Sequence, residues 1–204
     1  KRQTGVSQGD RYMFICVFRL KDLVRYFLLI VLLVFGAVLI ANFVKPNTRN
    51  VFSSGRDLPI YSIDCKEKHI SITFDCAWGA HDIPDILKTL DEEGVKATFF
   101  IVGQWAEKFP EAVRQIALKG HDVANHSYSH LRMGAVDRGR IRNEISVCGK
   151  KLGEISGKKV ELFRAPYGDY NNDVVGIARE LGYFTIQWDV DSLDWKPGIS
   201  GEEI

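Results

Sequence analysis

Four short polar clusters stand out, because each follows a run of residues that is typical of a β-strand. They occupy residues 73–79, 125–130, 164–168 and 191–195. Together they contain a carboxylate, two histidines, an arginine and a second acidic group, a set that can bind a substrate and activate water. Polar groups after the strands of an α/β domain usually converge on the face that holds the active site. The order and spacing therefore predict a hydrolytic site.

Asp75 is the first catalytic candidate, since a carboxylate at the C-terminal end of a strand can act as a general base on water. The alternative is an ordinary aspartate in a surface turn. Trp78 and Gly79 follow Asp75 directly and indicate a shaped pocket. We therefore expect Asp75 to act on water and Trp78 to contact the substrate.

His126 and His130 are four residues apart in a loop of small polar residues. Their neutral imidazoles could bind a divalent metal. Packing or chance is the alternative explanation for such a pair. Because the loop follows the end of a strand, the pattern favours a metal site.

Arg164 could hold a carboxylate with two hydrogen bonds and tune its pKa, although a structural salt bridge would make the same contact. Pro166 and Gly168 stiffen and open the adjoining turn. Asp194 and Trp195 place an acid beside an aromatic surface, which suits orienting a histidine or gripping a sugar ring. The tryptophan could instead belong to the core.

The elements that must position these clusters alternate between strand and helix. Alternating or apolar runs predict strands over 69–74, 97–102, 122–125, 161–163 and 183–188. Apolar residues at steps of three and four predict helices that include 83–90, 113–117, 141–155 and 174–181. This β-α-β-α order predicts an α/β fold with a parallel sheet and helices outside it.

The N-terminal part predicts membrane attachment. Residues 26–44 are uncharged and rich in Leu, Val, Ile and Phe, and spanning a bilayer takes about 20 such residues. A buried core helix and a cleaved signal peptide are the alternatives. We expect a cytoplasmic segment at 1–25, a single transmembrane anchor at 26–44 and a polar linker at 45–68. The domain at 69–204 would then lie outside the cell membrane.

Charge and cysteine content narrow the possible partners. The formal net charge is +1, and there is no basic patch with interleaved aromatic residues, so nucleic acid is not an expected partner. The four cysteines form no CxxC pair, which does not indicate a disulfide scaffold. A single bridge between Cys65 and Cys148 remains an alternative. The sequence does not indicate the oligomeric state.

The polar clusters resemble four of the five motifs of the NodB-homology polysaccharide deacetylases, carbohydrate esterase family 4, in order and over residues 68–204. Residues 74–79 and 187–195 are most similar to the sporulation-associated PdaB-type group of that family. The resemblance implies a distorted (β/α) barrel that removes N- or O-acetyl groups from cell-wall or spore peptidoglycan or a related glycan. Such a protein is a hydrolase that acts on non-peptide carbon–nitrogen bonds.

The family's motifs also imply roles for individual residues. Asp75 falls at the position of the catalytic base, Arg164 at the position that orients this base, and Asp194 at the position that tunes a catalytic histidine. His126 and His130 fall at metal-ligand positions. The residues that we expect to bind the glycan are Trp78, Pro166, Tyr167 and Trp195.

Two departures from the family pattern affect these expectations. Metal-dependent members have Asp-Asp in the first motif, and the second position here is Cys76. A thiolate ligand with His126 and His130 would favour zinc over harder ions. The fifth motif, with its acid histidine, would lie beyond Ile204, so we expect a C-terminally incomplete barrel. The alternative function is a membrane-anchored glycan-binding pseudoenzyme that has lost the metal site.

Overall fold

The structure is a computed structural model that describes residues 25, 27–34, 36, 55–202 and 204. The chain divides into two units, residues 1–51 and 52–204. In the first unit, residues 27–34 are helical with exposed side chains. Within the described ranges, no helix combines the length and the apolar character that a membrane crossing requires. Most of the predicted anchor, namely 26, 35 and 37–44, lies outside the described residues, so the anchor stays a prediction.

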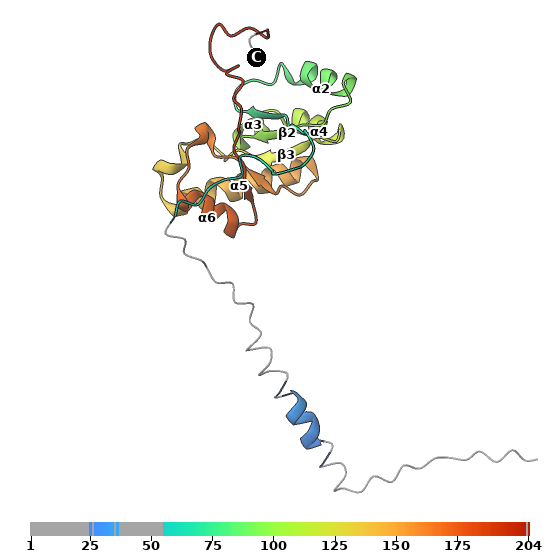
Figure 1. Cartoon of the computed structure of the whole chain (residues 1–204), viewed down its shortest axis with the longest axis vertical. Helices are drawn as coiled ribbons and strands as arrows, with labels where there is room; N and C mark the ends of the chain where they lie inside the picture. Colours follow the sequence, from blue (N-terminus) through green and yellow to red (C-terminus); the bar gives the residue numbers. More distant parts are fainter. Residues whose placement is uncertain (1–24, 26, 35, 37–54, 203) are drawn as a thin grey trace, which may run out of the picture. The chain divides into compact units, whose positions relative to one another are not determined.

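The second unit contains a sheet with helices packed around it (Figure 1). The sheet is parallel, and its strand order follows the sequence. Its strands are β1 (Thr73–Cys76), β2 (Thr98–Ile101), β3 (Asp122–Asn125), β4 (Leu162–Phe163) and β5 (Phe184–Thr185). The predicted α/β fold with a parallel sheet is therefore confirmed. Because β1 and β5 lie at the two edges, the described strands form an open sheet, and the predicted barrel is not confirmed.

Helices connect the strands, and the apolar spacing predicted each of the five given next except α3. They are α2 (Ile83–Glu92), α3 (Gly103–Lys108), α4 (Pro110–Leu118), α5 (Arg138–Ser156) and α6 (Asn172–Glu180). The long helix α5 has clear end signals: Asp137 accepts a hydrogen bond from Arg140 N at its start, and Gly157 at its end has a φ of 67°. A capping aspartate and a left-handed glycine are typical helix boundaries.

The register of β1 and β2 separates two faces of the sheet. Asp75 pairs with Phe100, and Cys76 pairs with Ile101. Because successive side chains in a strand point to opposite faces, Thr73, Asp75 and Phe100 share one face, which we call the site face. The opposite face, which we call the helix face, packs in a hydrophobic cluster with residues of α2 to α5. Its members from β1 and β2 are Phe74, Cys76, Phe99 and Ile101.

Part of the predicted linker joins the sheet. Ile60 forms a parallel bridge with Ile186, and its amide donates to Thr185 O at 2.8 Å. The hydroxyls of Tyr61 and Tyr170 are 2.8 Å apart. The segment around Ile60 therefore runs along the β5 edge, whereas residues 45–54 lie outside the described residues.

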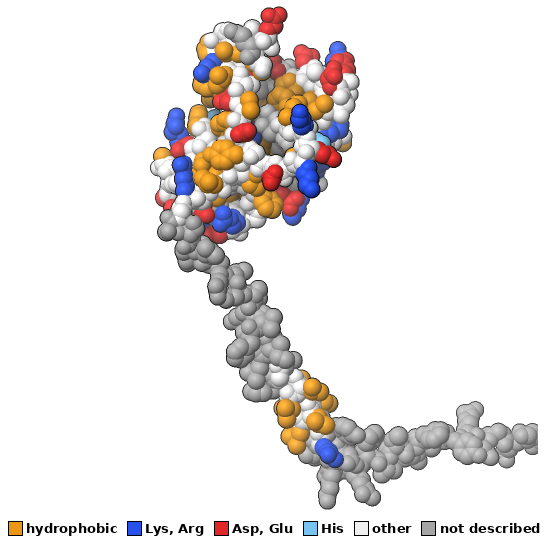
Figure 2. Space-filling view, viewed as in Figure 1, with side chains coloured by type: hydrophobic (Ala, Val, Ile, Leu, Met, Phe, Trp, Pro, Cys, Tyr) orange, Lys and Arg blue, Asp and Glu red, His pale blue; other side chains and the backbone are white. Residues whose placement is uncertain are grey.

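The surface of the second unit mixes both signs of charge. In Figure 2, lysine and arginine side chains lie among acidic ones, with hydrophobic side chains between them. Residues 52–204 contain 19 Lys and Arg and 24 Asp and Glu, a formal net charge of −5.

Candidate active site

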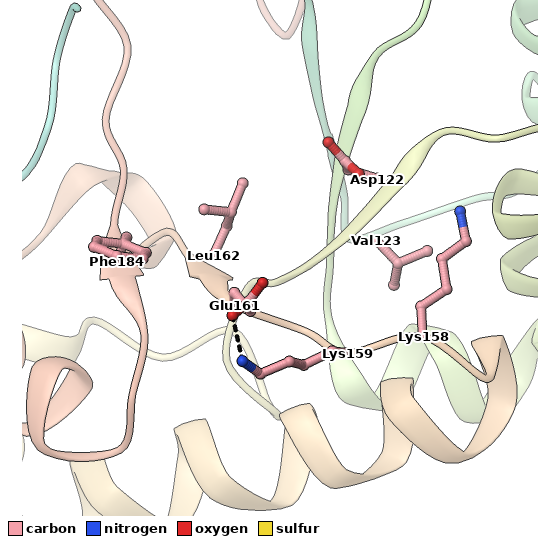
Figure 3. Close-up of a pocket in the computed structure, with 7 residues that line it drawn as sticks. All are labelled: Asp122, Val123, Lys158, Lys159, Glu161, Leu162 and Phe184. Atoms are coloured by element: carbon pink, nitrogen blue, oxygen red, sulfur yellow. Dashed lines mark hydrogen bonds and ion pairs between the residues drawn. The ribbon is translucent and has the colours of Figure 1, made fainter.

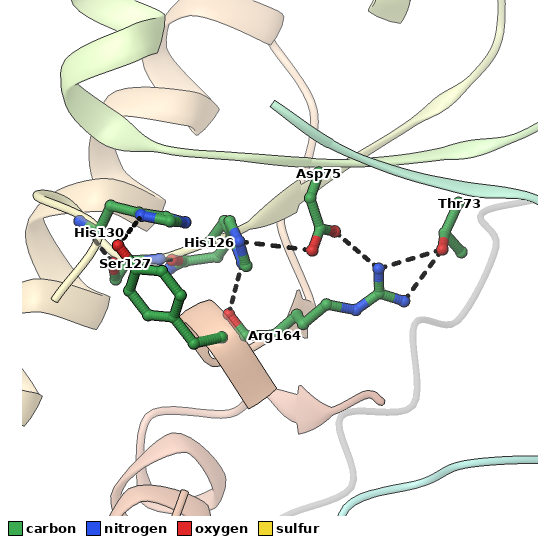
Figure 4. A network of polar contacts seen from close by, with 8 residues as sticks. Thr73, Asp75, His126, Ser127, His130 and Arg164 are labelled. Carbon is green, nitrogen blue, oxygen red and sulfur yellow. Dashed lines mark hydrogen bonds and ion pairs between the residues drawn. The ribbon is translucent and has the colours of Figure 1, made fainter. Parts of the chain in front are cut away.

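Asp75 lies at the centre of a polar network on the site face (Figure 4). Its side chain is 36% exposed, so a substrate can reach it. Oδ1 accepts a hydrogen bond of 2.7 Å from Arg164 Nη1, and Oδ2 lies 3.5 Å from His126 Nε2. The structure thus brings together three residues from β1 and from the segments that follow β3 and β4.

Arg164 is the buried anchor of this network. Its side chain is 4% exposed, and both terminal nitrogens donate to Thr73 Oγ1 at 3.1 Å. Its Cζ lies 3.9 Å from the centroid of the Phe100 ring. A guanidinium fixed by a hydroxyl and a ring holds the carboxylate beside it in one orientation. Arg164 therefore holds the Asp75 carboxylate in one orientation in this structure, and its catalytic role stays a prediction.

His126 offers an unprotonated nitrogen to the site. Its Nδ1 lies 2.9 Å from Arg164 O, and a carbonyl oxygen only accepts hydrogen bonds, so Nδ1 carries the proton. Burial lowers the pKa of His126, which favours the neutral ring. Nε2 then faces Asp75 Oδ2 with a lone pair, and both atoms are acceptors. Water donating to these atoms, or a cation between them, would relieve their repulsion.

His130 belongs to a row of aromatic rings beside this pair. Its ring centroid lies 5.1 Å from that of His126, 4.7 Å from that of Tyr167 and 5.8 Å from that of Trp78. Burial, followed by the neighbouring His126, lowers the pKa of His130 to about 4. Trp78 and Tyr167 are 79% and 54% exposed, respectively. Exposed rings next to a carboxylate suit the apolar face of a sugar.

Glu144 on α5 holds the loop that carries both histidines. Its buried carboxylate accepts hydrogen bonds from Tyr128 N at 2.9 Å and from Ser129 N and Oγ at 2.7 Å. Arg140 Nη2 lies 2.8 Å from the same carboxylate. Glu144 is not among the site residues predicted from the sequence. A signal was present, because this acidic residue lies among the apolar positions of the helix that includes Ile141, Ile145 and Cys148.

Cys76, the predicted third metal ligand, lies on the helix face and not with the histidines. It is 6% exposed and packs in the hydrophobic cluster. Burial, with a smaller contribution from the charge of Asp75, raises the pKa of the Cys76 thiol to about 12, whereas a ligand thiol must lose its proton. Among the described residues, no group of three His, Cys, Asp or Glu side chains is placed to hold a metal ion. The described residues therefore do not complete the expected zinc site.

The last predicted cluster does not join the network. Asp194 is exposed and accepts a hydrogen bond of 2.7 Å from Ser192 Oγ. Trp195 is also exposed, and Lys196 Nζ lies 5.3 Å from its ring centroid. Trp188 comes nearer, since its ring centroid lies 5.6 Å from Arg164 Cζ. Among the predicted glycan contacts, Pro166 is buried.

A cavity of about 280 Å³ lies elsewhere on the sheet (Figure 3). Three of its lining residues, Asp122, Leu162 and Phe184, are the first residues of β3, β4 and β5. Lys159 and Glu161 form an ion pair beside them. The cavity is thus at the amino ends of the strands, whereas Asp75 and the histidines lie at or beyond the carboxyl ends.

Comparison with known proteins places this site in a family. Residues 62–186 match the family model described as polysaccharide deacetylase. The chain is 38% identical to a peptidoglycan-N-acetylglucosamine deacetylase of Bacillus cereus, over 66% of this chain and 49% of that protein. It is 31% identical to the peptidoglycan-N-acetylmuramic acid deacetylase PdaA of Bacillus subtilis, over 67% and 52%.

A solved structure is also similar to this chain. It is that of a CE4 family pseudoenzyme from Bacillus anthracis, with a TM-score of 0.66, 33% identity and coverage of 68% of this chain and 49% of that one. The chain belongs to the polysaccharide deacetylase family. It spans about half the length of the curated relatives it matches.

Proposed function

We propose that the protein containing this chain removes acetyl groups from N-acetylated amino sugars of peptidoglycan or a related glycan. The observation that carries this proposal is the exposed Asp75 carboxylate, held by Arg164 and facing the unprotonated nitrogen of His126. The names of the Bacillus relatives support the substrate class. A sporulation role of the PdaB type stays a prediction.

The proposed reaction uses Asp75 as a general base. Asp75 takes a proton from water, and the resulting hydroxide attacks the carbonyl carbon of the acetamide. A C–O bond forms, the C–N bond breaks, and the leaving nitrogen receives the proton that Asp75 took from water, so the products are a free amine and acetic acid, which ionises to acetate. Arg164 keeps Asp75 in position throughout, and the rings of Trp78 and Tyr167 support the sugar. Because the described residues do not complete the zinc site, no step here passes through a metal.

A second candidate function is glycan binding without hydrolysis. The burial of Cys76 on the helix face favours it, since this position carries the expected third ligand. The similarity to a pseudoenzyme of the family points the same way. In that case the aromatic row would still hold a glycan.

Acetate release distinguishes the two candidates. The complete gene product that contains this chain is incubated with peptidoglycan and with acetylated chito-oligosaccharide, with and without a chelator. We expect acetate from the parent protein and a loss of about 10²- to 10⁴-fold in Asp75→Asn, which removes the base. Saturable glycan binding without acetate release would instead support the second candidate, a glycan-binding protein without hydrolytic activity.

We also propose that residues 26–44 anchor the protein in the cell membrane with the catalytic domain outside. The proposal rests on the uncharged apolar character of that stretch. Protease added to intact protoplasts should remove the domain. Protection until lysis would reject this topology.

A further inference from the structure

We propose that Arg132 forms an anion subsite next to the aromatic row and recognises a carboxylate on the glycan. This inference rests on the proposed glycan substrate and specifies its chemistry. The preferred substrate would be an acidic amino sugar, such as muramic acid with its lactyl ether. A neutral chitin-type chain would bind without using this subsite.

The first observation is the placement of Arg132 on an exposed ring. Its Cζ lies 4.8 Å from the centroid of the Tyr167 ring, and the side chain is exposed. A guanidinium stacked on an aromatic face keeps its edge N–H groups available for a planar acceptor. Carboxylates fit this edge with two parallel hydrogen bonds.

The second observation is that Arg132 has no acidic partner in the part of the chain that the structure describes. The neighbouring arginines on α5 differ: Arg138 pairs with Asp173, Arg140 with Glu144 and Arg142 with Glu180. No described carboxylate comes within 4.0 Å of the Arg132 nitrogens. Because the exposed guanidinium of Arg132 forms no ion pair among the described residues, its charge is available for an anionic ligand.

The acidic residue Asp169 near Arg132 accepts a hydrogen bond from a backbone amide. Asp169 follows Gly168 in the loop that carries Tyr167, and its Oδ2 accepts a hydrogen bond of 3.1 Å from Gly134 N. This contact joins the Arg132 loop to the Tyr167 loop. It engages one oxygen of the Asp169 carboxylate, which forms no ion pair with Arg132 in the part of the chain that the structure describes.

Arg132 is linked to the reacting end of the site through Tyr167. His130 and Arg132 both contact this tyrosine, and His130 Nδ1 lies 3.2 Å from the Tyr167 hydroxyl. His130 in turn packs against His126, which faces Asp75. An acetamide at Asp75 and a carboxylate at Arg132 would therefore lie along one row of contacts.

Two disaccharides test this proposal, because they differ only in the lactyl group. The probes are N-acetylglucosaminyl-N-acetylmuramic acid and N,N′-diacetylchitobiose, below called chitobiose, titrated by ligand-observed NMR, which also detects released acetate. We expect the complete gene product to bind the lactyl disaccharide roughly three- to tenfold more tightly, as an exposed charge-assisted contact allows. High salt should reduce this preference.

Substitutions of Arg132 test whether this residue causes the preference for the lactyl disaccharide. Arg132→Gln should remove it and leave the affinity for chitobiose unchanged, whereas Arg132→Lys should retain part of it. Arg142→Gln is the matched control, since Arg142 is paired with Glu180, and it should keep the full preference. Equal binding of both probes by the parent, or a preference that survives Arg132→Gln, overturns the subsite and leaves the proposed function standing. Failure to bind either probe would overturn both the Arg132 subsite and the proposed function.

Discussion

The site face and the helix face of the sheet differ in what their side chains contact, although neighbouring residues of one strand supply both. On the site face, Asp75 is partly exposed and held by Arg164. On the helix face, Cys76 is buried among apolar side chains. Adjacent residues of a strand point to opposite faces, so they cannot both belong to one site while the strand stays extended.

The largest expected effect comes from placing a charge on the helix face. Cys76→Asp should lower the free energy of unfolding by about 3–5 kcal/mol, because an unpaired carboxylate would be buried. Denaturant unfolding measures this change. Cys65→Asp is the matched control, since Cys65 is exposed, and it should change stability by no more than about 0.5 kcal/mol.

A stable Cys76→Asp protein would contradict the placement of this position on the helix face. If Cys76→Asp remained as stable as the parent and took up one zinc ion, the end of β1 would have to turn toward the histidines. The helix-face assignment of this position would then be wrong.

A smaller effect is expected from the loop that carries the histidines. Glu144→Ala should lower the free energy of unfolding by about 2–3 kcal/mol, since it leaves two partly buried amides of the loop without their acceptor. Glu154→Ala on the same helix is the control, because Glu154 pairs only with Lys150 at the surface. Equal effects of the two changes in denaturant unfolding would show that Glu144 does not hold the loop.

The last expected effect is a dependence of stability on pH. The folded-state pKa values of His126 and His130 are lowered, that of His130 to about 4, while an unfolded histidine titrates near 6.5. The unfolded chain therefore binds more protons below about pH 6.5, and stability falls as the pH falls from there toward 4. Stability from these groups is fully present above pH 6.5.

Urea unfolding at pH 7.5, 6 and 5 measures this dependence. His130→Gln should make the slope shallower without abolishing it, because burial also lowers the pKa of His121 and His126. A slope in His130→Gln as steep as that of the parent would show that His130 is not protected from protonation in the folded state.

Much of the fold could be predicted from apolar spacing. The third strand was predicted at 122–125, where β3 lies, and α6 lies within about two residues of its predicted range. The convergence of Asp75, His126 and Arg164 also follows from their places after parallel strands. These features depend on local periodicity and on strand order, which a sequence displays directly.

The placement of Cys76 could not be predicted, because it depends on where β1 ends. The alternation of residues 69–74 predicted a strand that stops at Phe74, which would leave Cys76 in a loop with freedom to turn. In the structure β1 runs over Thr73–Cys76, so pairing with β2 fixes Cys76 on the helix face. The position of Asp194 similarly depends on the course of the chain after β5, where residues 192–195 do not pair with the sheet. Strand ends are set by tertiary pairing, not by local propensity.

Thiol labelling tests the two-face account most directly. The full chain is treated with iodoacetamide at pH 7.5, before and after urea unfolding, and Cys65 and Cys76 are compared by peptide mapping. The account predicts that native Cys65 is labelled, that native Cys76 is protected with or without added zinc, and that both are labelled when unfolded. Labelling of native Cys76 as fast as Cys65, with protection by zinc, would contradict it.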